Sequence, residues 1–442
     1  MRSEHVPVPT RLRRARLAVS AIFFVHGAVF ASWAARVPSV KDDLHLSAGV
    51  LGLVLAGPGV GALAGSQAGG LLVHRLGSRA VSALAPVGLS VPLGLIPAAD
   101  SAWPLLVLLL LLGAADGCTS VAMNAQAVVV QHRYGRTVMN SMHAIRSMGA
   151  VAGGLAGVAT AGLGLDLTTQ FVLMAVVLGV ISALAACGLP PDGQRGEPPD
   201  RQQGEQPGEA ARFREEPTGR PPASPAPDLG EPPQTNSRSL VLLLAVMTFL
   251  ASLVEDAPAS WSGVYLRQVG ADAALAAAGY AAFSAGGVVT RLLNDRLVNR
   301  LGWVRLIRAG TLCCAAALTV ALLLGHPLVM LAALVVAGAG ISAVFPGAFT
   351  AAGALPHPAL AMGQVGFAGN LGWLLVSPVI GGLATVVGLP AALGVLALAA
   401  VTIALLAPVT GPGTSRHPGE REAVRPGGPG AGRYREGGEG AR

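Results

Sequence analysis

The sequence predicts an all-α integral membrane protein with 12 transmembrane helices in two pseudo-symmetric six-helix bundles. Twelve apolar stretches are long enough to cross a bilayer, and one polar insert rich in Pro and Gly divides them six and six. Apolar residues make up 52% of the chain and charged residues 12%, whereas a soluble domain carries about 25% charged residues. Because hydrocarbon offers no partner to a backbone amide, each stretch is expected to be a helix.

The spans follow from the ends of the apolar stretches. In the first half we expect helices over 15–36, 48–73, 80–98, 104–130, 138–163 and 168–189. In the second half we expect helices over 239–266, 273–297, 303–324, 327–352, 361–385 and 389–409. The resulting regions are a tail (1–14), an N-terminal bundle (15–189), a linker (190–238), a C-terminal bundle (239–410) and a second tail (411–442).

The distribution of arginine predicts the orientation. Loops on one side are basic and the short loops on the other side are nearly uncharged, which is the positive-inside pattern. The basic side carries Arg11, Arg13, Arg14, Arg16, Arg75, Arg79, Arg133, Arg136, Arg296, Arg300, Arg305 and Arg308. We therefore expect a multi-pass protein of the cell (inner, cytoplasmic) membrane with both termini and the linker in the cytoplasm. The linker has almost no large apolar side chains, which predicts a disordered tether.

Charge and motif content exclude several function classes. The net charge is +7, but Lys and Arg lie between apolar stretches and in the tails, which argues against binding nucleic acid. The sequence has no phosphate-binding loop of the form G-x-x-x-x-G-K-[ST], so we do not expect the chain to drive transport with ATP. It also lacks metal-spaced His and Cys residues and paired catalytic carboxylates. We expect no enzymatic activity, no cofactor and no metal.

An internal repeat relates the two halves. Residues 72–77 (LVHRLG) end the second predicted helix, and residues 297–302 (LVNRLG) end the eighth. Gly61 and Gly286 occupy matching positions before them. A duplicated six-helix unit is typical of two-bundle secondary transporters.

The first copy of this repeat resembles the loop signature of the major facilitator superfamily, roughly G-x-L-x-D-R-x-G-x-R. Residues 70–79 match it at Gly70, Leu72, Arg75, Gly77 and Arg79. His74 replaces the aspartate, and Asn299 occupies the equivalent place in the second half. The resemblance implies a cytoplasmic gate at these turns. The implied gate also includes Arg300, with Asp295, one turn before Asn299, as the substitute carboxylate.

Four further blocks resemble the fucose-permease-like branch of that superfamily, in particular its bacterial inner-membrane relatives. They are residues 33–38 (WAARVP), 121–126 (VAMNAQ), 139–144 (MNSMHA) and 261–266 (WSGVYL). The branch includes proton-coupled sugar symporters. It often carries an acid at the positions that Ser120 and Ser260 hold here. The resemblance implies proton-linked transport of a small solute by a monomer.

Ionisable groups inside the predicted helices are candidates for the site, because each costs about 2.5–3.5 kcal/mol to insert. They are Asp116, His143, Arg146, Glu255 and Asp256. Asp116 shares one face of its helix with Ser120 and Asn124, and Asn140, His143 and Arg146 share a face of the next. Three alternatives stay open: a static Asp116–Arg146 ion pair, a packing role for His143, and an Asp256 that is merely solvated at the outer end.

Uncharged polar and aromatic side chains complete the candidate pocket. His26, Phe30 and Trp33 form a stripe on the first helix, Gln364 and Asn370 lie in the eleventh, and Trp261 and Tyr265 lie in the seventh. A sugar binds through hydrogen bonds and an aromatic ring, which this mixture provides. The alternative for Trp33, Trp261 and Tyr265 is the aromatic belt at the membrane interface.

Glycines recur every fourth residue on the second helix (57, 61, 65, 69) and the fifth (149, 153, 157), and others crowd the eleventh (363, 366, 369, 372). Small residues allow close helix approach. We interpret these stripes as surfaces on which the two bundles move; the alternative is ordinary tight packing.

The leading functional prediction is a secondary active transporter that moves a small polar, sugar-like solute by alternating access, with protons as the coupling ion. The alternative is a drug or metabolite exporter that works by proton antiport. The fifth helix lacks the Gly-Pro motif of such antiporters, but residues 377–382 (SPVIGG) of the eleventh resemble it.

The predicted orientation can be tested by labelling. After replacement of the four native cysteines, a cysteine at Gln203 in the linker should react with an impermeant maleimide only from the cytoplasmic side. A matched cysteine at Asp100 should react only from outside. Labelling of position 203 from outside, or an odd number of crossings, contradicts the two-bundle arrangement.

Overall fold

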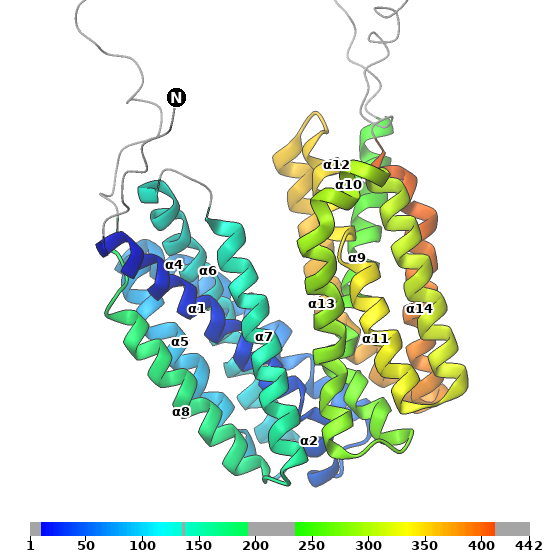
Figure 1. The fold of residues 1–442 in the computed structure, drawn as a ribbon, viewed down its shortest axis with the longest axis horizontal. Helices are drawn as coiled ribbons and strands as arrows, with labels where there is room; N and C mark the ends of the chain where they lie inside the picture. Colours follow the sequence, from blue (N-terminus) through cyan, green and yellow to red (C-terminus); the bar gives the residue numbers. More distant parts are fainter. Residues whose placement is uncertain (1–9, 135–137, 193–234, 412–442) are drawn as a thin grey trace, which may run out of the picture.

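The computed structural model describes residues 10–134, 138–192 and 235–411, which form two groups of helices (Figure 1). Across these ranges no strand occurs, and 12 helices are long and apolar enough to cross a membrane. The predicted fold class is therefore confirmed. The predicted tails and linker lie almost entirely outside the described residues.

The N-terminal bundle contains six of the membrane-length helices. Its elements are α1 (Thr10–Ala34), α2 (Val37–Asp43), α3 (Ala48–Val54), α4 (Gly57–Leu76), α5 (Ser78–Leu95), η1 (Ile96–Ala98), α6 (Ala102–Tyr134), α7 (Met139–Gly162) and α8 (Leu167–Ala186). Helices α3 and α4 together make one span. Pro58 lies in the first turn of α4, where its missing amide hydrogen is no loss.

The C-terminal bundle supplies the other six. Its elements are α9 (Thr235–Gln268), α10 (Ala273–Leu324), α11 (Pro327–Ile341), α12 (Val344–Gly353), α13 (Pro358–Val387), α14 (Leu389–Leu406) and η2 (Ala407–Thr410). Helix α10 contains two spans, Ala273–Asn294 and Arg296–Leu324, and bends at Gly302, while α11 with α12 forms one span. Helix α9 begins at Thr235, about one turn inside the predicted linker.

Equivalent glycines show that the halves repeat one packing scheme. Gly77 and Gly302 both have positive φ, 89° and 74°, at the turn that each copy of the repeat predicts. A Cβ at Gly61 would collide with the Leu110 carbonyl of α6, and one at Gly286 would collide with the Val335 carbonyl of α11. The duplication therefore extends from the sequence motif to the helix contacts.

The glycine stripes pack within each bundle, so their assignment to a moving interface was wrong. Gly65 lies against the Ala114 carbonyl of α6, and Gly153 lies against the Ala28 carbonyl of α1. In the other bundle, Gly372 of α13 lies against the Phe249 carbonyl of α9. A glycine every fourth residue lets two helix backbones of the same bundle touch, which is the tight-packing alternative.

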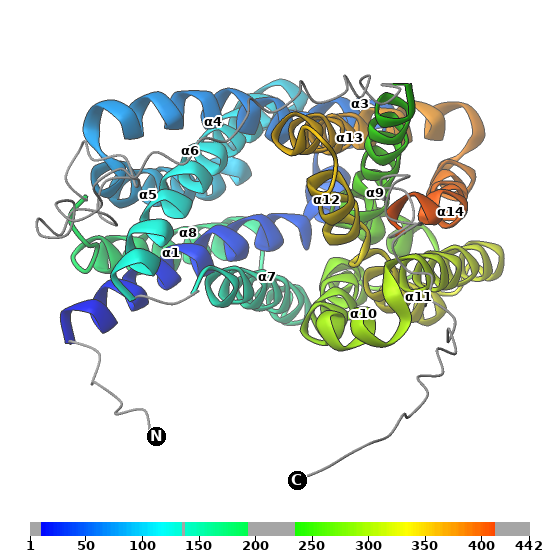
Figure 2. The ribbon, with the colours of Figure 1, turned by 90° about the horizontal axis from the view of Figure 1, so that it is seen from above.

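The two bundles meet at one end of the molecule and separate at the other (Figure 1). We call the end with α2 the distal face, and the end with Thr10 and Thr410 the terminal face. Seen from above, α7 lies beside α10 and α3 lies beside α13 at the boundary (Figure 2).

Close backbone contacts between the bundles lie on the distal side. A Cβ placed on Gly52 of α3 would lie 2.9 Å from Cα of Gly381 in α13, and one on Gly263 of α9 would lie 2.6 Å from Cγ of Pro38 in α2. Toward the terminal face, Cβ positions at Gly70 of α4 and Gly363 of α13 have no neighbouring atom within 4 Å. The structure is therefore closed on the distal face and open toward the terminal face.

The Gly52–Gly381 contact predicts the effect of one methyl group. A Cβ on Gly381 would lie 2.7 Å from the Ala48 carbonyl oxygen and 2.8 Å from Cα of Gly52, whereas Gly382 has open space. Gly381→Ala should destabilise distal closure by about 1–3 kcal/mol, and Gly382→Ala should not. A cysteine at Ser260 should then react faster with a maleimide applied to the distal face in Gly381→Ala alone. Equal labelling rates in the two variants would contradict this account of the contact.

Candidate functional site

A cavity of about 430 Å³ lies between the two bundles. Helices α1, α4, α6 and α7 line it from one side, and α9, α10, α11 and α13 line it from the other. Apolar and small residues form much of its wall, among them Val29, Gly59 and Phe283. The charged side chains are grouped on α1, α6 and α7 in one bundle, and on α9 and α10 in the other.

The wall from the N-terminal bundle centres on His26 of α1. Its Nε2 lies 3.0 Å from Oδ1 of Asp116 in α6. Both imidazole nitrogens are buried and neither forms a hydrogen bond, so the contact is electrostatic and attractive only when His26 carries a proton. Gly27 lets α1 pack closely against α7 next to this histidine, because a Cβ at Gly27 would collide with the Arg146 carbonyl. His143 of α7 packs edge-on against Phe23, with ring centroids 5.1 Å apart.

The wall from the C-terminal bundle centres on Glu255 of α9. Its Oε1 accepts a hydrogen bond of 2.5 Å from Nη2 of Arg291 in α10, which makes an ion pair between neighbouring helices. Asp256 follows directly in α9 and also lines the cavity, together with Tyr280 and Ser284 of α10. Each bundle therefore has one paired carboxylate facing the shared space.

The Asp116–Arg146 ion pair, which was one of the open alternatives, does not form. Asp116 pairs with His26 instead, and Arg146 makes no ion pair or side-chain hydrogen bond within the described part of the chain. Asp256 lines the cavity and is not simply solvated at a helix end. His143 is exposed to the cavity and so does more than fill the core.

The cavity brings together eight of the predicted candidates. They are His26, Phe30, Trp33, Asp116, His143, Arg146, Glu255 and Asp256. Trp33 is 2% exposed and packs against Phe171, while Trp261 and Tyr265 are almost fully buried. Burial excludes the interfacial aromatic belt for all three, because a belt residue must reach the headgroups.

The remaining predicted site residues lie elsewhere. Asn124 donates a hydrogen bond to the Ser120 carbonyl of its own helix, 2.8 Å away, and does not line the cavity. Gln364 and Asn370 are exposed on other parts of α13, and Trp261 belongs to the core. Asn140 lies in α7, but its side chain is outside the described structure.

Sequence reasoning missed Arg291 and Tyr280. An arginine well inside the predicted helix 273–297 was a usable signal, since intramembrane charge is rare. Tyr280 had no such signal, because a single tyrosine in an apolar helix usually packs in the core. Only the packing of α10 against α9 shows that both side chains face the cavity.

The loop that carries the signature motif is hydrogen-bonded to an acidic residue that the sequence did not indicate. Asp192, just after α8, accepts hydrogen bonds from the Ser78 hydroxyl (2.5 Å), the Arg79 backbone amide (2.9 Å) and the Gln126 side-chain amide (3.3 Å). Its carboxylate thus lies at the first turn of α5, beside Gly77. The expected substitute for the missing aspartate was Asp295, whose side chain is outside the described structure.

Two other members of the expected gate, Gly70 and Arg300, lie at the terminal face. Gly70 has open space around it, and Arg300 is exposed beside the Gly302 turn. The polar link that the structure does show between bundles is distal. There, Nε of Arg267 in α9 lies 3.7 Å from Oδ2 of Asp42 in α2.

Polar groups also brace the distal ends of the N-terminal bundle. The guanidinium of Arg36 donates a hydrogen bond of 2.8 Å to the Leu165 carbonyl, which ties the end of α1 to the loop before α8. Asp166 caps α8, and hydrogen bonds from the side chain and backbone of Thr169 lower the pKa of its carboxyl.

Two bundles related by a repeat, closed at one face around a charged central cavity, describe a secondary transporter. The sequence profile of the Major Facilitator Superfamily matches residues 18–360. The chain belongs to this superfamily. It is also 31% identical to an uncharacterised MFS-type transporter of Yersinia pestis over 86% of this chain and 92% of that protein. The membrane protein MosC of Rhizobium meliloti is 28% identical over 85% of each chain.

Solved transporters share the fold. A bacterial homolog of the human lysosomal transporter Spinster, in an inward-facing and unoccupied conformation, superposes with a TM-score of 0.68 at 15% identity. That comparison covers 93% of this chain and all of the other. The nucleoside transporter NupG gives 0.65 at 14% identity, covering 90% and 98%, and a D-xylose-proton symporter gives 0.63 at 12%, covering 89% and 97%.

The Asp192 contacts predict a loss of stability in the transporter. Asp192→Ala removes three hydrogen bonds to a carboxylate and should destabilise the N-terminal bundle by about 1–3 kcal/mol. Thermal unfolding of the detergent-solubilised protein measures the change. The matched control is Asp100→Ala, whose carboxylate accepts one exposed hydrogen bond from Ser101. If both variants unfold at the wild-type temperature, Asp192 does not hold this turn.

Proposed function

We propose that this MFS transporter moves a small polar solute, sugar-like or a related metabolite, by alternating access and couples this movement to protons. The observation that carries the proposal is the cavity of about 430 Å³ that the two bundles share, with an ionisable pair on each wall. A cavity of this volume suits a solute of about monosaccharide size.

Alternating access fits the asymmetry of the contacts. Glycine and proline contacts close the distal face, and the helices separate toward the terminal face (Figure 1). With the termini in the cytoplasm, as the arginine distribution predicts, this is an inward-facing state. Rocking of the bundles would break the Gly52–Gly381 contact and the Asp42–Arg267 ion pair and open the cavity outward.

The His26–Asp116 pair is the best-placed site for a coupling proton. With a proton on the pair, imidazolium and carboxylate attract each other; without it, an uncompensated carboxylate remains in a space from which closure removes water. His143 and Arg146 face this pair from α7. The opposite wall presents Glu255, Asp256, Tyr280 and Arg291.

The uncharged residues that line the cavity suit the recognition of a sugar-like solute. Trp373 is 49% exposed and offers an indole ring, and Ser147, Ser260, Ser284 and Tyr280 offer hydroxyl groups along the cavity. An aromatic face with several hydrogen-bonding groups suits a polyhydroxylated ring. The four sequence blocks that resemble the fucose-permease-like branch favour the same substrate class.

The alternative is a proton-antiport exporter of the same fold. Residues 377–382 of α13 resemble the antiporter motif, and they form the part of α13 that contacts α3 at the distal face. In that case an imposed proton gradient would drive the solute out of the cell. The direction of solute movement distinguishes the two functions.

Uptake into energised membrane vesicles tests the proposal. Right-side-out vesicles with the protein should accumulate one of a panel of sugars and related metabolites, and a proton uncoupler should abolish the accumulation. Glu255→Gln removes the ionic partner of Arg291 and should abolish accumulation, whereas Asp100→Asn in an exposed loop should not. Accumulation that persists in the presence of the uncoupler would contradict proton coupling. Unchanged accumulation in Glu255→Gln would show that Glu255 is not part of the site.

A further inference from the structure

Two charged side chains in the cavity have no partner in the described protein, and they lie on opposite bundles. They are Arg146 of α7 and Asp256 of α9. The other charged groups of the cavity walls are paired, Asp116 with His26 and Glu255 with Arg291. The cavity therefore presents one unpaired guanidinium and one unpaired carboxyl group.

Arg146 cannot relieve its charge by losing a proton, because a guanidinium stays protonated in proteins. Its neighbours on the same bundle offer one carboxylate, Asp116, which lies against His26 and forms no ion pair with Arg146. His26 and His143 are neutral or cationic, and Asp116 is already within 3.0 Å of His26. The planar donors of Arg146 thus face the cavity without an acceptor, which is the arrangement that binds a carboxylate or another oxyanion.

Asp256 is the matching group on the other wall. Its sequence neighbour Glu255 takes the Arg291 guanidinium, and no described side chain donates a hydrogen bond to Asp256. A carboxylate in a membrane-embedded cavity is costly unless a cation or a donor meets it. An ammonium group of a solute would supply both.

One cavity joins the two groups. Tyr280 of α10 lines it together with Arg146 and Asp256. Because the cavity measures about 430 Å³, a single solute of monosaccharide size can reach both side chains.

We propose that the transported solute is dipolar, with an anionic group that binds Arg146 and an ammonium group that binds Asp256. This inference rests on the proposed transport function and narrows its substrate class. A neutral sugar leaves both charges unpaired, an organic anion leaves Asp256 unpaired, and an organic cation leaves Arg146 unpaired. Because the two charges belong to different bundles, a dipolar solute also links the bundles and favours closure around itself.

Binding of matched probes tests this inference without any transport. The detergent-solubilised full chain is titrated with D-glucose, D-glucosamine, D-gluconate and D-glucosaminate, which share a carbon skeleton and are neutral, cationic, anionic and dipolar. L-Glutamine is a second dipolar probe without that skeleton. Thermal stabilisation gives each Kd. At least one dipolar probe should bind about tenfold or more tightly than the other three, as expected for an added charge-assisted hydrogen bond.

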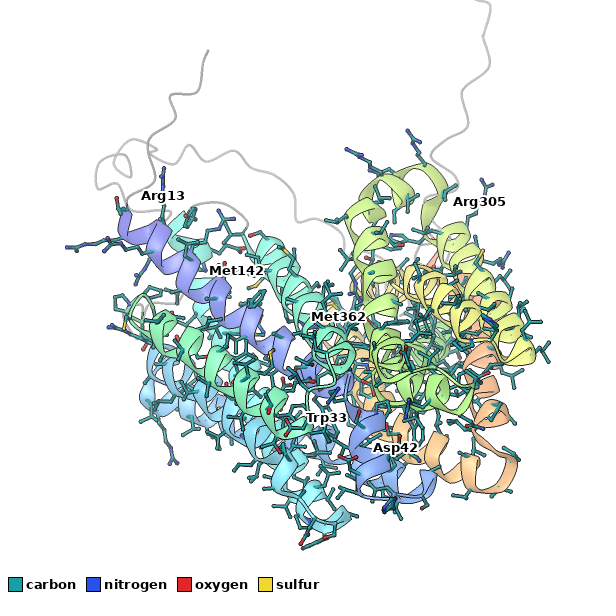
Figure 3. All side chains as sticks on the ribbon, turned by 60° about the horizontal axis from the view of Figure 1, so that its bottom comes forward. Arg13, Trp33, Asp42, Met142, Arg305 and Met362 are labelled. Atoms are coloured by element: carbon teal, nitrogen blue, oxygen red, sulfur yellow. The ribbon has the colours of Figure 1, made fainter. Side chains whose placement is uncertain are left out.

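Charge-removing variants should change selectivity in opposite directions. Arg146→Gln should bind D-glucosamine as well as D-glucosaminate, and Asp256→Asn should bind D-gluconate as well as D-glucosaminate. Arg146→Lys and Asp256→Glu should keep the dipolar preference. Arg305→Gln and Asp100→Asn are matched controls outside the cavity, and Arg305 lies far from the cavity residue Trp33 (Figure 3). The unliganded unfolding temperature of each variant reports whether it has folded.

Three results would overturn the dipolar assignment: neither dipolar probe binds, a neutral or singly charged probe binds as tightly as the dipolar ones, or both charge-removing variants keep wild-type selectivity. The last two would leave transport itself intact and point to a sugar, an anion or a cation. Dipolar binding without gradient-driven uptake would instead support the site and contradict the proposed transport. The two proposals can thus fail separately.

Discussion

Hydrocarbon provides no hydrogen-bond partner, and this constraint acts on both the backbone and the side chains of the transporter. It forces each span into a helix, since only a helix satisfies its amides internally. It also confines charge, because an ionisable group facing lipid would be costly. Glu255 and Arg291 illustrate the result: they meet across two helices and face the cavity between the bundles.

The small residues divide into two groups with different consequences. Glycines such as Gly61 and Gly286 bring helices of one bundle into backbone contact, and the repeat places them at equivalent points in both halves. This packing makes each bundle a rigid unit. Gly52 and Gly381 instead join the two units, on the distal side alone. The proposed alternating access would have to separate this contact.

The cavity charges connect this architecture to solute recognition. Pairs within a bundle, such as His26 with Asp116, keep their geometry when the bundles rock, because both partners move together. Arg146 and Asp256 belong to different bundles, so the proposed alternating access would change the distance between them. Ion pairs within one bundle suit the binding of a coupling proton. Unpaired groups on opposite bundles suit a ligand that stabilises closure.

The sequence by itself determined the 12 spans, their division into two halves and the repeat, because these depend on apolar length and on local motifs such as the Gly77 turn. It also identified most charged members of the cavity, since intramembrane charge stands out in an apolar helix. Only the tertiary structure decided the partners. That Asp116 meets His26 rather than Arg146, and that Asp192 holds the loop at Gly77, depends on how helices distant in sequence rotate and pack against each other. Periodicity along one helix carries no information about that rotation.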